Sequence, residues 1–344
     1  MRWNKKVIAL VLTAAMILNM GTPVWAEEHS ADRSRSGEKK LAAPVVEGNT
    51  YYFDLSTVGA VGTINPALPD QTLHYVPFVY TGTINAYNLA STSSGNTGAS
   101  TEASKNPTDR SLFLAEHDVS NIVSWNTLNG VGLIFYKMFD NNKYILRSLS
   151  GGGTTDNNTP ITNSEWDSIL AKNSGWIKNC SVDYHSLTQD TDSREQGARI
   201  IRGGQSPYDS WTVTVDGSNK NVCWRPALEV RTSKALSPVT LSLGGAALNG
   251  KTDNIHIVCA GDTFKAPSAI GLTAPKGQNN QTFISWVDTN GNQSYAPGAD
   301  VPNTVTGLTA QWGTGLACTV IEGNKEEVIG GADKALKLTG NGTY

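Results

Sequence analysis

Apolar and polar residues alternate in short runs along the chain, and these runs predict strands. Residues 51–55 and 74–80 form such runs near the start, and residues 255–259 form another further on. A period of two places the apolar side chains on one face of a strand, and the runs end near Gly, Asn or Asp, which favour turns. The pattern therefore predicts a β-rich α+β protein.

One segment has the period of a helix. Trp166, Ile169 and Leu170 share a face at spacings of three and four residues, and Asn163 or Ser164 can cap the helix. The spacing predicts a short helix with one buried face.

The same helix carries Glu165 and Asp167 on either side of Trp166. Glycosidases use two carboxylates that flank one bond. Residues two apart on a helix do not face each other, so this pair could not bracket a bond. We expect both carboxylates on the helix surface.

Two glycine-containing segments predict turns. Residues 245–252 match the spacing of a phosphate-binding loop, which requires a helix to begin at its Lys-Thr. Residues 253–258 alternate like a strand instead, so the segment is interpreted as a turn. The pair Asn290-Gly291 predicts a tight hairpin turn, because both central residues of the favoured two-residue turn need positive φ.

The first 26 residues have the features of a signal peptide. Arg2, Lys5 and Lys6 precede an apolar run at 7–20, and small residues lead to a cleavage site after Ala26. The apolar run is shorter than the roughly 20 residues that span a bilayer. The protein is therefore expected to be secreted, and it can be associated with the cell surface.

Charge excludes two classes of partner. Removing the leader takes away three of the 27 basic residues and none of the 30 acidic ones, so the net charge changes from −3 to −6. Without a dense basic run, neither nucleic acid nor an anionic membrane surface is an expected partner. Residues 27–44 are highly charged and poor in apolar side chains, which is typical of a disordered linker.

Residues 238–313 contain an ordered set of short elements: Gly244-Gly245, Phe283-x-x-Trp286, Pro297-Gly298 and Ala310-x-Trp312. This set resembles the internalin B-type (Listeria–Bacteroides) repeat, a β-grasp-like module of bacterial surface proteins. The resemblance implies display or adhesion at the cell surface. Residues 314–344 are expected to be a tail or the start of a further β domain, with strands at 318–321 and 334–338.

Residues 45–233 form the larger predicted domain, and its motifs are Leu146-Arg147-Ser148, Glu165-Trp166-Asp167, Arg202-Gly203-Gly204, Trp211 and Cys223-Trp224-Arg225-Pro226. They resemble the C-type-lectin-like domains of the formylglycine-generating-enzyme type and an uncharacterised domain of secreted clostridial proteins. The resemblance implies a mixed α/β fold with ligand-contacting loops. Cys180 and Cys223 match no catalytic cysteine of the enzymes, so oxidase activity is not implied; the two can form a disulfide in an oxidising compartment.

The predicted ligand-binding residues are Tyr208, Asp209, Trp211 and Asn219. Tyr208 follows Pro207 in a loop and is the best single candidate, whereas Trp211 and Trp224 are better explained as core residues. The Ser/Thr/Gly/Asn-rich loop at 88–109 is the alternative site.

Few residues of the chain match a known catalytic or metal-binding pattern. The acids Asp183, Asp190, Asp192 and Glu195 could offer oxygens to calcium, but scattered acids are usually solvated, so no metal and no cofactor is expected. No Gly-x-Ser-x-Gly or His-Glu-x-x-His motif is present, and no catalytic residue is predicted. The sequence favours a non-enzymatic protein that binds a glycan or protein ligand in adhesion. A carbohydrate-active hydrolase with a dispersed site and a structural spacer are the alternatives.

Overall fold

The computed structural model describes residues 44–59, 61–84, 110–141, 143–152, 164–178, 184–192, 194–231, 234–277, 281–290, 293–314, 324–329 and 335–339. The predicted signal peptide, nearly all of the predicted linker and the 88–109 loop lie outside these residues. Within them, helices are short and none has the length and apolar character needed to cross a membrane.

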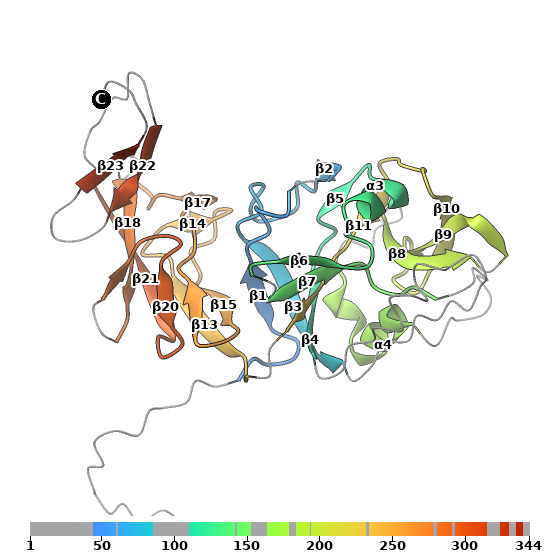
Figure 1. Ribbon diagram of the computed structural model, residues 1–344, viewed down its shortest axis with the longest axis horizontal. Coiled ribbons are helices and arrows are strands. Elements are labelled where there is room, and N and C mark those ends of the chain that lie inside the picture. The colour runs from blue at the N-terminus through green and yellow to red at the C-terminus, as the bar shows by residue number, and fades with distance from the viewer. Residues whose placement is uncertain are drawn as a thin grey trace, which may run out of the picture. The chain divides into compact units, whose positions relative to one another are not determined.

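Two six-stranded sheets are built from residues 50–230 (Figure 1). The first is antiparallel throughout, in the order β1 (Thr50–Phe53), β3 (Val76–Ile84), β4 (Arg110–Ala115), β12 (Ala227–Val230), β7 (Tyr144–Arg147) and β6 (Lys137–Phe139). The early strands predicted at 51–55 and 74–80 are β1 and β3.

The second sheet has the order β10 (Ser210–Thr214), β9 (Glu195–Gly203), β8 (His185–Asp192), β11 (Val222–Trp224), β5 (Ser120–Asn121) and β2 (Thr63–Ile64). Strands β8 and β11 are parallel, and the other neighbours are antiparallel. The helical elements are α3 (Trp125–Gly130), α4 (Glu165–Lys172) and the 3-10 turn η1 (Ser174–Trp176). Helix α4 is the predicted helix. The Ser164 hydroxyl caps it by accepting the Asp167 amide at 3.1 Å, and Trp166, Ile169 and Leu170 are buried.

A third sheet follows in the chain, in the order β15 (Ile255–Cys259), β13 (Ser237–Ser242), β21 (Gly307–Thr314), β18 (Gln281–Asp288) and β19 (Ser294–Tyr295). Its central strands β13 and β21 are parallel. Three short pairs complete the described strands: β14 (Ala247–Leu248) with β17 (Leu272–Thr273), β16 (Thr263–Lys265) with β20 (Asp300–Pro302), and β22 (Asn324–Ile329) with β23 (Ala335–Thr339). The β-rich character is confirmed. The two domain assignments stay predictions.

Of the two predicted turns, the one at residues 245–252 is present and the one at Asn290-Gly291 differs in width. Leu248 and Lys251 exchange backbone hydrogen bonds of 2.9 and 3.0 Å around Asn249 and Gly250, whose φ values are 48° and 74°. The segment that matches a phosphate loop is thus a two-residue hairpin turn followed by strand β15. The hairpin between β18 and β19 is wider than predicted, because Asp288 donates to the Gln293 carbonyl at 2.9 Å across four intervening residues.

Buried side chains connect the third sheet to the first two. Val258 and Ala260 pack into the hydrophobic core of the first two sheets, while Tyr75 packs into the core of the third. Tyr75 is 1% exposed, and its hydroxyl donates to the Ser268 carbonyl. The Asp70 carboxylate fixes the approach to Tyr75 by accepting backbone amides of residues 72, 74 and 75 at 2.7 to 3.1 Å. The turn at Asp70 therefore fixes one of several contacts between the sheets.

Replacing Tyr75 tests this contact. Tyr75→Ala leaves a cavity in the third core and should lower the free energy of unfolding by about 3 to 5 kcal/mol. Tyr75→Phe removes only the hydroxyl and should cost about 1 kcal/mol. Urea unfolding of both variants measures the difference. An alanine variant as stable as the wild type would contradict a buried role for Tyr75.

Candidate functional site

The β9–β10 hairpin presents two large aromatic side chains to solvent, Tyr208 from its loop and Trp211 from β10. Tyr208 is 57% exposed and Trp211 is 47% exposed, whereas Trp224 is only 2% exposed. The core prediction is therefore confirmed for Trp224 and wrong for Trp211. The reason lies in the sheet order, since Trp211 belongs to β10, an edge strand of the second sheet.

The buried guanidinium of Arg202 bonds to the backbone of this loop. Its Nε atom donates to the Asp209 carbonyl at 3.1 Å, and Nη2 donates to the Tyr208 carbonyl at 3.3 Å. The same guanidinium forms an ion pair with Asp167 at 2.6 Å and donates to the Gly151 carbonyl at 2.6 Å. Because Arg202 is 1% exposed, these bonds are shielded from water and fix the backbone beneath Tyr208.

Helix α4 supplies a second anchor to the loop. The indole nitrogen of buried Trp166 donates to the Pro207 carbonyl at 2.8 Å, directly before Tyr208. The Asp209 carboxylate accepts the Ser206 amide at 2.9 Å, which closes the loop on itself. The loop is therefore ordered before any ligand arrives, and this lowers the entropic cost of binding.

Glycine is required where the loop leaves β9. Gly204 has φ of 113°, and a Cβ atom there would lie 2.6 Å from the Nε2 atom of His185. The His185 ring in turn meets the Trp211 ring edge to face, with centroids 6.2 Å apart. The close approach of backbone to imidazole thus helps to place Trp211.

The remaining predicted ligand contacts have local roles. Asp209 is half-buried, and its carboxylate already accepts a hydrogen bond from the Ser206 amide. Asn219 is exposed in the turn before β11, where its side-chain oxygen accepts the Asn221 amide at 2.8 Å. The structure therefore brings Tyr208 and Trp211 onto one hairpin, and it places Asn219 in a separate turn.

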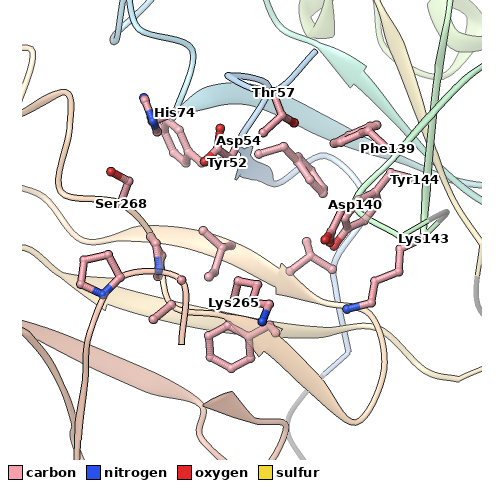
Figure 2. Close-up of a pocket in the computed structure, with 18 of the residues that line it drawn as sticks. Tyr52, Asp54, Thr57, His74, Phe139, Asp140, Lys143, Tyr144, Lys265 and Ser268 are labelled. Atoms are coloured by element: carbon pink, nitrogen blue, oxygen red, sulfur yellow. The ribbon is translucent and has the colours of Figure 1, made fainter. Parts of the chain in front are cut away.

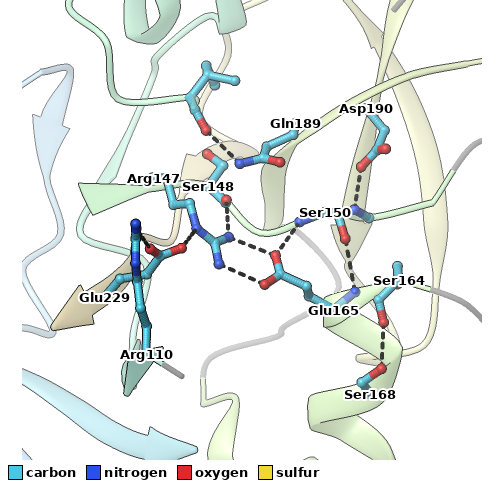
Figure 3. A network of polar contacts seen from close by, with 12 residues as sticks. Arg110, Arg147, Ser148, Ser150, Ser164, Glu165, Ser168, Gln189, Asp190 and Glu229 are labelled. Carbon is cyan, nitrogen blue, oxygen red and sulfur yellow. Dashed lines mark hydrogen bonds and ion pairs between the residues drawn. The ribbon is translucent and has the colours of Figure 1, made fainter. Parts of the chain in front are cut away.

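Buried ion pairs support helix α4, as Figure 3 shows. Both oxygens of Glu165 accept from the Arg147 guanidinium at 2.7 Å, and Arg147 Nε donates to Glu229 at 2.5 Å. Arg110 reaches Glu229 at 2.7 Å from the other side. The prediction of a surface carboxylate is therefore wrong for Glu165, which is buried, whereas Asp167 keeps 16% of its side chain exposed. Each is bound to a buried arginine, so neither is an available catalytic acid.

The predicted acidic residues are also not uniformly solvated. Asp190 and Asp192 are buried, and one oxygen of Asp190 accepts the amides of Gly151 and Gly152 at 2.6 and 3.3 Å. Glu195 is exposed, and Asp183 lies outside the described residues. Over the part of the chain that the structure describes, no group of three His, Cys, Asp or Glu residues is arranged to hold a metal ion.

A cleft of about 580 Å³ is a feature that sequence analysis missed (Figure 2). It is lined by Tyr52, Phe53, Asp54, Thr57, His74, Tyr75, Phe139, Asp140, Asn141, Lys143, Tyr144, Ile257, Val258, Thr263, Phe264, Lys265, Ala266, Pro267, Ser268, Pro297 and Gly298. Burial raises the pKa of Tyr144, and Asp140 adds to the effect. Burial, with Glu116, also raises the pKa of Tyr52. A phenol is protonated at neutral pH in any case, so these shifts extend the protonated form to higher pH.

A scan against protein-family models, a search of curated proteins and a search of solved structures each found no match. The resemblances to C-type-lectin-like domains and to the internalin B-type repeat therefore stay predictions. The function has to be argued from the geometry of the hairpin and the cleft.

The disulfide between Cys180 and Cys223 also stays a prediction. Cys223 is buried in β11, and Cys180 lies outside the described residues. A bridge would close a loop of about 40 residues and should stabilise the fold by about 3 to 4 kcal/mol. Thiol labelling of the native secreted protein checks it, and labelling of both residues without a reductant would refute the bridge.

Arg202 should be essential for the order of the β9–β10 loop. Arg202→Met leaves Asp167 without its partner and should lower the free energy of unfolding by about 3 to 5 kcal/mol, with faster amide exchange at residues 204–209. Lys265→Met is the control, since both side chains of its pair with Asp300 are at least half exposed, and this substitution should cost less than about 1 kcal/mol. Equal effects of the two substitutions would show that the loop does not depend on Arg202.

Proposed function

We propose that this chain is a secreted or cell-surface protein that binds a glycan or protein ligand without transforming it, and that the β9–β10 loop is its contact surface. The observation that carries the proposal is the pair of exposed aromatics, Tyr208 and Trp211, on a backbone fixed by buried Arg202 and Trp166. An exposed aromatic on a fluctuating loop needs no functional explanation. An aromatic held rigidly at the surface offers contact area at low entropic cost.

Glycans are the favoured ligand class. Aromatic faces present broad apolar surface, and the Tyr hydroxyl and Trp N–H add polar contacts at the edge of the ring. A sugar ring combines an apolar C–H face with hydroxyls and so complements such a surface. The predicted display at the cell surface places the loop where glycans are abundant.

The hydrolase alternative rests on a specific observation, because Asp54 and Asp140 both line the cleft. One oxygen of Asp54 already accepts the Ser56 amide and hydroxyl at 2.9 and 2.6 Å, so this carboxylate stabilises its own turn. A hydrolase would lose its activity in both Asp54→Asn and Asp140→Asn. We favour binding because it requires no second role for Asp54.

Tyr208→Ala and Trp211→Ala test the binding proposal on the full chain. The glycan found by array screening of the wild type should bind each variant about ten- to a hundredfold more weakly, because losing an aromatic contact typically costs about 1 to 3 kcal/mol. The Tm should change by less than about 2 °C, since both side chains are exposed.

Tyr136→Ala provides the matched control, since Tyr136 is an exposed aromatic outside the β9–β10 loop. Its affinity should equal that of the wild type. Full affinity in both Tyr208→Ala and Trp211→Ala would exclude this loop as the contact surface. A large loss of stability would instead show that the aromatics are structural.

A further inference from the structure

The cleft has a preformed aromatic wall. The Phe53 and Tyr144 rings meet edge to face with centroids 5.7 Å apart, and Phe139 packs on Tyr144 at 5.2 Å. These rings come from β1, β6 and β7 of the first sheet, and they hold one another in place. The lining also includes Val258 of β15 in the third sheet and Phe264 of β16. Aromatic faces of this kind complement the apolar face of a ligand ring.

Two lysines, Lys143 and Lys265, line the cleft. Lys265 forms an ion pair with Asp300 at 3.0 Å. Lys143 is partly buried, and among the described residues no carboxylate lies within ion-pair distance of its ammonium group. Figure 2 shows the Lys143 side chain extending from the Tyr144 side of the cleft toward the side of Lys265. A half-buried, unneutralised ammonium is a binding position for a ligand anion.

The Lys143 ammonium is held near the third sheet. Burial raises the pKa of the Cys259 thiol, and Lys143 partly opposes this shift, as a nearby cation does. The Lys143 backbone is fixed on both sides, since its amide donates to the Asp140 carbonyl at 3.1 Å and its carbonyl accepts the Arg231 amide at 2.8 Å. The charge is thus carried on a fixed backbone segment.

The rim of the cleft is built from unusual backbone conformations. Asp140 and Asn141 have φ values of 46° and 52°, and Leu73, which precedes the cleft residue His74, has φ of 63°. Left-handed conformations are costly for residues other than glycine, most of all for a bulky residue such as leucine. The polar residues Thr57, His74 and Asn141 also line the cleft, where they offer hydrogen-bond donors and acceptors.

We infer that the cleft is a second binding site, separate from the β9–β10 loop, for a sugar-sized ring that carries a carboxylate. The ring lies against Phe139 and Tyr144, the carboxylate meets Lys143, and the hydroxyls bond to the polar rim. The volume of about 580 Å³ falls in the range of small-ligand sites. A neutral ring would leave the Lys143 charge unmatched, and a purely aromatic acid would leave the rim without partners, so an acidic saccharide uses more of the site than either.

Titration calorimetry with three probes and the full chain tests this inference. D-glucuronate should bind saturably, with a Kd in the range of about 1 mM or below. Glucose lacks the carboxylate and benzoate lacks the hydroxyls, and each should bind at least tenfold more weakly. Absence of saturable glucuronate binding would overturn the inference. Benzoate binding as tight as that of glucuronate would overturn the saccharide assignment.

Lys143→Met identifies the anchoring charge. This variant keeps the length of the side chain and should weaken glucuronate binding at least tenfold, while Lys251→Met, which removes an exposed lysine outside the cleft, should leave the affinity unchanged. Unchanged affinity in Lys143→Met would overturn the inference. Should that variant fail to unfold cooperatively, Lys143→Gln takes its place with the same expected loss. Tyr208→Ala should bind glucuronate like the wild type. The proposal for the cleft and the proposal for the β9–β10 loop can therefore be refuted independently.

Discussion

The fold depends on three arginines that are almost completely buried. Arg147, Arg202 and Arg225 are each 1% exposed, and each guanidinium bonds to segments far apart in the chain. Arg225, for instance, reaches the Glu116 carbonyl at 2.6 Å and the Lys178 carbonyl at 2.6 Å. A buried charge is costly unless most of its hydrogen-bonding groups are satisfied. Both Nη atoms of Arg225 have partners, whereas its buried Nε atom has none among the described residues. Each arginine therefore fixes the relative position of strands and loops that apolar packing alone would leave free to shift.

This constraint explains how the chain can expose large aromatics without disorder around them. The backbone at Tyr208 is bonded to Arg202, which is bonded to Asp167 on helix α4, and that helix is bonded through Glu165 to Arg147 on β7. The aromatic rings are about half exposed, whereas Asp167 is 16% exposed and the other charged members of this series are almost completely buried. The position of the Tyr208 backbone thus depends on two ion pairs beneath it, Arg202 with Asp167 and Arg147 with Glu165.

Local physics makes the strands, the helix and the turn at residues 245–252 predictable from sequence. The period of two marks β1, the spacing of Trp166 and Ile169 marks α4, and the alternation at 253–258 excludes the helix of a phosphate loop. The width of the hairpin predicted at Asn290-Gly291 is wrong, because the backbone bond that closes it joins Asp288 to Gln293. The partners of Glu165 were not predictable, because Arg147 belongs to another element and only the folded chain brings them together. Trp211 was assigned to the core because sequence does not reveal which strand lies at the edge of a sheet. The exposure of Tyr208 is predictable without knowledge of distant contacts, because Pro207 beside it indicates a loop.

The cleft marks the limit of sequence analysis most clearly. Phe53 and Tyr144 are 91 residues apart in the chain, Phe264 follows Tyr144 by another 120, and no spacing rule connects them. The first sheet brings Phe53 to Tyr144, and Phe264 joins them at the junction where Tyr75 is buried in the third core. A ligand that contacts both sides binds only when this junction is formed. Its binding free energy would then add to the stability of the junction, by about 2.7 kcal/mol at a concentration 100 times Kd. Recognition in the cleft and the attachment of the third sheet are therefore thermodynamically linked, whereas the β9–β10 loop, fixed by its own arginine, would act without that linkage.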